Sequence, residues 1–60
     1  MELKLDFVHD DGKESGICHV HKVSGAELRK VGEIKFSDES DKRWIRMVMI
    51  EDHPNVSVIS

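Results

Sequence analysis

Hydrophobic and charged residues alternate at the start of the chain. Leu3, Leu5 and Phe7 are separated by single charged residues, and this period of two predicts a strand with one buried face. The β-branched run at residues 17–23 suits a second strand. Asp-Gly at residues 11–12 lies between the two runs and favours a two-residue hairpin turn.

That turn also predicts a register for the hairpin. It places Leu5 opposite Cys18 and Phe7 opposite Gly16, so that apolar positions pair with apolar ones. A longer loop over residues 10–16 would instead place Leu5 opposite His21, and a one-residue slip reverses the two faces of a strand. The tight turn is therefore favoured, and Gly16 is a candidate bulge. The expected buried face holds Leu3, Leu5, Phe7, Cys18 and Val20.

The middle of the chain allows two interpretations. Ser24 and Glu27 have the spacing of a capping box, and Gly32 is suited to end a helix, so the pattern predicts a short helix over Ser24–Val31. The alternation at residues 33–36 predicts a strand, and this strand could extend back through Leu28.

Residues 44–50 form the longest apolar segment. A strand is favoured here, because a helix of this composition would be apolar on nearly every side and hard to bury in so small a chain. The alternative is a helix over residues 41–51 with Ser40 or Asp41 as its cap. Pro54 lies in a turn, and residues 56–59 are expected to form a last strand, paired with the preceding one and exposed at a sheet edge.

Residues 1–60 are thus expected to form a single small domain of mostly β class. The predicted architecture is a small antiparallel sheet or a partly open five-stranded barrel, with one short helix near residues 24–31. The alternative is an α+β fold with residues 41–51 helical. A chain of 60 residues has a thin stability margin and little room for a deep catalytic pocket.

Charge, cysteine content and motifs exclude further classes. The net charge of −3 argues mildly against nucleic acid, which usually binds a basic face. The single Cys18 forms no intramolecular disulfide, and the first residues lack the apolar run of a secretion signal. We therefore expect a reduced cytoplasmic protein with no membrane partner. No phosphate-binding loop or other cofactor motif occurs, so no cofactor is expected.

Three groups of side chains are candidates for chemistry. His19 and His21 share a strand face and could chelate a metal ion, but a structural zinc site usually needs four ligands. Cys18 points to the other face, and is expected to be a small core residue rather than a nucleophile. The third group is a basic and aromatic patch that could bind phosphates and stack bases. Its members are Arg29, Lys30, Lys42, Arg43, Trp44 and Arg46.

The sequence therefore predicts a non-enzymatic module that binds another protein. The apolar residues after position 43 exceed what a 60-residue interior is expected to bury, and surplus apolar surface marks an interface. The module is expected to regulate by stoichiometric contact, with a homodimer through this surface or the terminal edge left open. Nucleic-acid binding and metal binding are the alternatives. The predicted partner-binding residues are Trp44, Arg46, Met47, Met49, Val56 and Val58.

Overall fold

The computed structural model describes residues 2–59, which form one four-stranded sheet and one helix. The elements, in chain order, are β1 (Leu3–His9), β2 (Gly16–Ser24), β3 (Glu27–Phe36), α1 (Glu39–Asp52) and β4 (Val56–Val58). The mostly β class is confirmed. The sheet is open rather than barrel-like, and the described residues form four strands, not the five expected.

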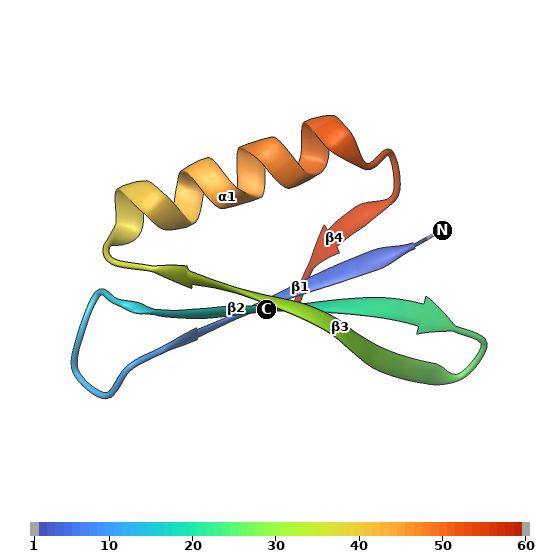
Figure 1. Cartoon of the computed structure of the whole chain (residues 1–60), viewed down its shortest axis with the longest axis horizontal. Helices are drawn as coiled ribbons and strands as arrows, with labels where there is room; N and C mark the ends of the chain where they lie inside the picture. The colour runs from blue at the N-terminus through green and yellow to red at the C-terminus, as the bar shows by residue number, and fades with distance from the viewer. Residues whose placement is uncertain (1, 60) are drawn as a thin grey trace.

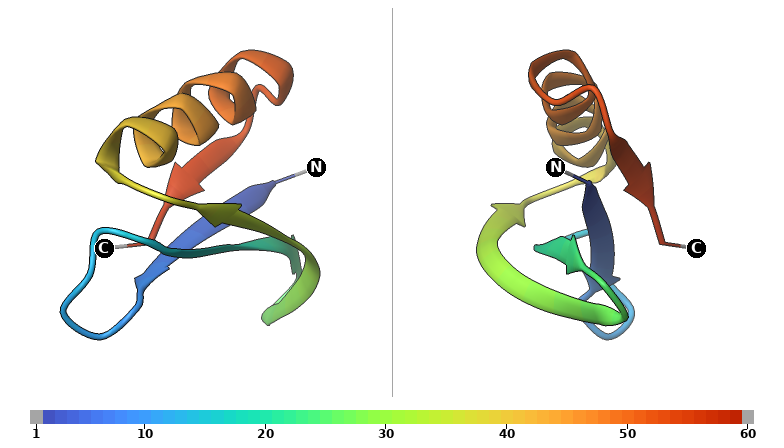
Figure 2. Two further views of the ribbon diagram at one scale, coloured as in Figure 1. Left: turned by 60° about the vertical axis from the view of Figure 1, so that its left-hand side comes forward. Right: turned by 90° about the vertical axis from the view of Figure 1, so that its right-hand side faces the viewer.

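The strands lie in the order β3-β2-β1-β4. β1, β2 and β3 are antiparallel neighbours, whereas β4 runs parallel to β1. α1 therefore connects the two edges of the sheet and crosses one face on the way (Figure 1). Figure 2 shows the twist of the sheet and the helix on one side of it. No helix formed by residues 2–59 covers the other face of the sheet.

The first hairpin has the predicted faces but not the predicted register. Leu5 pairs with Val20, and Phe7 pairs with Cys18, so the strands are shifted by two residues and the buried face is unchanged. The reason is a longer connection: the Asp10 carbonyl accepts from the Lys13 N–H at 3.0 Å, and the Ser15 carbonyl accepts from the Asp10 N–H at 2.8 Å. The Asp-Gly pair therefore forms a turn inside a six-residue loop.

The predicted helix over Ser24–Val31 is wrong, because this segment belongs to a second hairpin. Ser24 pairs with Glu27, and Gly25 has a φ of 60°. A two-residue turn with glycine at its first central position is the type II′ arrangement. β3 thus extends back past Leu28, as the second interpretation allowed, with a register shift opposite Val20 and His21.

The favoured strand over residues 44–50 is also wrong, and the alternative helix is correct. The prediction assumed that all its apolar residues had to be buried, yet Ile45 is the one buried residue of α1. The helix begins after Asp38 rather than at Ser40 or Asp41: the Asp38 carboxylate accepts a hydrogen bond from the Asp41 N–H at 2.8 Å.

The last strand is confirmed as a short edge strand, but its neighbour differs from the prediction. Val56 pairs with Leu3 and Val58 with Leu5, because the preceding segment is helical and returns the chain to the far side of β1. The Asn55 carbonyl accepts from the Leu3 N–H, and the Leu5 carbonyl accepts from the Ile59 N–H, both at 2.8 Å.

The core lies between the sheet and α1. Ile45 is 4% exposed and is the helix's main contribution; burying such a side chain stabilises the fold by about 1.5–3 kcal/mol. Phe7, Ile34, Met49 and Val56 pack around this centre. The buried hydrophobic residues are Leu3, Leu5, Cys18, Val20, Phe36 and Ile45.

Candidate protein-binding surface

The orientation of α1 is fixed at its first turn. The Asp41 carboxylate accepts from the Ser37 N–H at 3.0 Å, which complements the Asp38 cap. Nε2 of His9, at the end of β1, lies 3.0 Å from Oε1 of Glu39, and the His9 ring contacts Phe36 edge to face. These contacts join the start of the helix to the sheet, and so determine which side of α1 faces outward.

Three large apolar side chains lie on the outward side of α1. Trp44 is 63% exposed, Met47 58% and Ile50 49%. They are spaced by three residues, and residues three or four apart share a helix face. We call these three residues the outer stripe. It covers the middle half of the helix, on the side turned away from Ile45 and the sheet.

Of the predicted partner-binding residues, Trp44 and Met47 belong to this stripe, and Arg46 is exposed beside it. Met49 and Val56 are partly buried and pack against the buried cluster, so they offer less surface than the stripe. Val58 is partly exposed at the β4 edge, apart from the helix. Ile50 was absent from the predicted set, although the spacing from Trp44 through Met47 identifies it once residues 44–50 are taken as a helix.

Two arginines border the outer stripe. Arg43 lies one helical turn before Met47, and Arg46 one turn before Ile50; both are exposed. The ion pairs among residues 2–59 include neither of them. Lys42 differs, because its Nζ lies 3.8 Å from Oε2 of Glu39 and 5.5 Å from the centre of the Phe7 ring.

The predicted basic patch is therefore only partly assembled. Arg43, Trp44 and Arg46 are together on α1, whereas Arg29 and Lys30 lie on β3 near the second turn. Lys30 also forms an ion pair with Glu33. That lysine, through its hydrogen bond and its charge, lowers the pKa of the Glu33 carboxyl.

The open face of the sheet places the histidines among charged neighbours. His19 lies between Asp6 and Glu33, and His21 between Lys4 and Lys30, in the rows set by strand pairing. The two imidazole rings are 6.4 Å apart, and Nδ1 of His21 is buried with no hydrogen-bond partner in the described chain. Within residues 2–59, no three histidine, cysteine or acidic side chains are grouped as a metal site would require.

Cys18 lies in the core, as expected. Burial, together with the negative charge of Asp6, raises the pKa of its thiol to about 11. A nucleophilic cysteine needs the thiolate and access to a substrate, and Cys18 is fully buried. Its environment suits a small hydrophobic residue.

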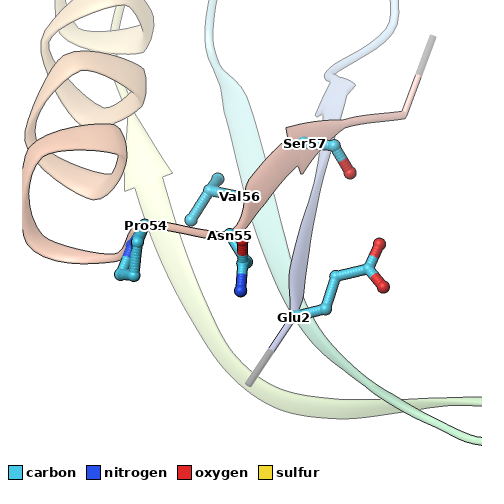
Figure 3. Close-up of a pocket in the computed structure, with 5 residues that line it drawn as sticks. All are labelled: Glu2, Pro54, Asn55, Val56 and Ser57. Atoms are coloured by element: carbon cyan, nitrogen blue, oxygen red, sulfur yellow. The ribbon is translucent and has the colours of Figure 1, made fainter.

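Among residues 2–59, two of the open surface hollows lie away from the outer stripe. One, of about 480 Å³, is lined by Glu2 and residues 54–57. Figure 3 shows Glu2 and Ser57 extending to the same side of the β1–β4 pair, with Pro54 at the other end. Glu2 is the one acidic or basic side chain among the residues that line this hollow. The other hollow, of about 430 Å³, includes Asp10 and Lys35.

The outer stripe is therefore apolar surface of α1 that the described fold leaves exposed. No helix in the described part of the chain is long and apolar enough to cross a membrane. Comparison of the chain with models of protein families, with curated proteins and with solved structures gave no match.

Proposed function

We propose that this chain is a non-enzymatic protein-binding module that regulates its partner by stoichiometric contact through the outer stripe of α1. The observation that carries the proposal is the exposure of Trp44, Met47 and Ile50 on one side of a helix. Tryptophan and methionine are enriched at interfaces, and a contiguous apolar surface favours contact with another protein. The contact is with a different protein or with a second copy of the chain.

Mixed charge on the open sheet face supports the choice of the helix. Exposed Val8 and Leu28 on that face alternate with charged residues along their strands. Val8 and Leu28 lie beside Ile17 and Val23 on the neighbouring strand, in two separate pairs, whereas Met47 has an apolar neighbour three residues away in each direction along α1. A continuous stripe excludes water more completely, which is how interface hot spots gain their energy.

A matched pair of variants tests the proposal. The full chain, immobilised, is exposed to host-cell lysate alongside Met47→Glu and Val31→Glu, which introduce the same charge at similarly exposed sites on α1 and β3. A protein captured by the wild type and Val31→Glu but lost with Met47→Glu is the expected result. Light scattering of the purified chain identifies self-association. Equal capture by all three proteins, with a monomeric chain, would contradict the proposal.

Nucleic-acid binding is the second candidate, because Arg43, Trp44 and Arg46 are exposed together. Three basic residues of α1 are offset by four acidic ones, which weakens attraction to phosphates. This candidate predicts quenching of Trp44 fluorescence by a single-stranded oligonucleotide at low salt. The protein-binding proposal predicts unchanged fluorescence in that titration.

A further inference from the structure

Resting on the proposed function, we infer that the outer stripe binds an acidic partner: an apolar segment of another protein whose carboxylates lie beside Arg43 and Arg46. The inference comes from the charges that border the stripe. Each arginine lies one turn before an exposed apolar residue, so a partner that covers Met47 and Ile50 also approaches both guanidinium groups.

Neither arginine forms an ion pair within residues 2–59. Glu39 is already engaged by His9 and Lys42, and the Asp41 carboxylate accepts from the backbone of Ser37. The first turn of the helix thus uses its own carboxylates for capping and for contacts with the sheet. Arg43 and Arg46 remain available, and guanidinium groups pair with carboxylates through directed hydrogen bonds.

The position of the remaining acidic residues gives the contact a direction. Glu51 lies one turn after Met47 and borders the stripe near the end of α1. A uniformly acidic partner would be repelled there, so its carboxylates are expected beside the first half of the stripe, with apolar residues over the second. Such an arrangement fixes orientation and register, which is the main contribution of charge at an interface.

A second copy of this chain fits the stripe less well. Antiparallel pairing of two α1 helices centred on Met47 would bring the Arg46 side chains of both copies to the same side of the contact, because Arg46 directly precedes that centre. Like charges placed together oppose association. A nucleic acid would meet the arginines but would leave Met47 and Ile50 without an apolar partner.

The probe is a displayed library of random peptides of ~16 residues, about four helical turns, selected against the full chain at low ionic strength. Enriched peptides should combine apolar residues with at least two carboxylates. Each should bind Met47→Glu and the double variant Arg43→Glu/Arg46→Glu roughly tenfold or more weakly. Replacing a peptide's carboxylates by lysines should restore binding to the double variant, and Arg29→Glu on β3 serves as the charge control.

Several outcomes would overturn the inference. Selection of uncharged or basic peptides, or of none, contradicts an acidic partner, and so does a chain that dimerises through α1. Peptides that need Met47 but bind the double variant normally would refute the acidic preference alone and leave the proposed surface standing. Peptides indifferent to both changes would refute the surface as well. Circular dichroism of each variant checks that α1 is intact.

Discussion

Gly16 lies directly against Phe36, so that a Cβ on Gly16 would come within 2.7 Å of the ring's Cζ and would clash with the Val8 carbonyl oxygen. The two residues are paired across β2 and β3, and the buried Phe36 ring packs against the glycine. A side chain here has to displace both an aromatic ring and the backbone of β1. The position is therefore restricted to glycine by packing, not by an unusual φ.

Gly16→Ala is accordingly expected to destabilise the fold by ~3 kcal/mol, the upper range for overpacking. Urea denaturation followed by circular dichroism measures the change in the free energy of unfolding. The control is Gly32→Ala in β3, where an added Cβ meets nothing within 4 Å. Equal stability of the two variants would show that the contact between Gly16 and Phe36 is not close.

Gly25→Ala is expected to destabilise the protein by ~1 kcal/mol. The φ of 60° lies in the left-handed region, where an L-residue with a Cβ is strained. The sign of the effect distinguishes the hairpin from the helix that Ser24 and Glu27 suggest, because alanine in place of glycine inside a helix is stabilising. Thermal unfolding monitored by circular dichroism reports the direction, and a raised midpoint would contradict the turn.

Truncation should lower the stability of the protein strongly at Ile45 and hardly at all at Trp44. Ile45→Ala removes buried contacts with the sheet and is expected to cost about 2–4 kcal/mol. Trp44→Ala removes an exposed side chain and is expected to change stability by less than ~0.5 kcal/mol. Denaturant titration of both variants measures this, with partner binding as a second readout. A large loss of stability in Trp44→Ala would mean that the tryptophan belongs to the core.

The buried face of a strand is predictable from the sequence, because the alternation of apolar and polar residues identifies that face by itself. Leu3, Leu5 and Phe7 identify the buried face of β1 without any knowledge of the register. The register itself depends on loop length, and an Asp-Gly pair predicts a turn without showing how many residues surround it. Ser24 and Glu27 mislead for a similar reason: a capping box and a β-turn use the same residues, and tertiary pairing selects between them.

The composition of the sequence indicates the candidate surface, but the expected strand does not indicate which residues form it. An excess of apolar residues after position 43 indicates an interface in either secondary structure, which is why Trp44 and Met47 are expected in it. In a strand Met49 would share a face with Met47, two residues before it, whereas the helix turns Met49 inward and Ile50 outward. A helix that is apolar on nearly every side is unfavourable only where the chain has to bury all of its apolar residues. The outer stripe of α1 is exposed, so this requirement does not apply.

The start of α1 offers a matched pair of substitutions. Asp38→Ala removes the hydrogen bond to the Asp41 N–H and should cost ~1 kcal/mol. Ser40→Ala, at the residue that the sequence suggested as a cap, should have almost no effect, because Ser40 lies inside the first turn and is exposed. Helix content and unfolding midpoints of the two variants test this, and a larger effect at Ser40 would place the start of the helix two residues later.

Cys18 should make the protein less stable at high pH. Its thiol has a pKa of about 11 in the fold against an ordinary value of 9.0, so the unfolded chain releases the proton first. The stabilisation is therefore complete below pH ~9 and is lost as the pH rises toward ~11, by an amount of order 2 kcal/mol. Lysines titrate over the same range, so the measured quantity is the difference between wild type and Cys18→Ala in urea denaturation at each pH. The two stabilities should converge, or cross, above pH 9; a difference independent of pH would show that the thiol ionises as readily in the fold as in the unfolded chain.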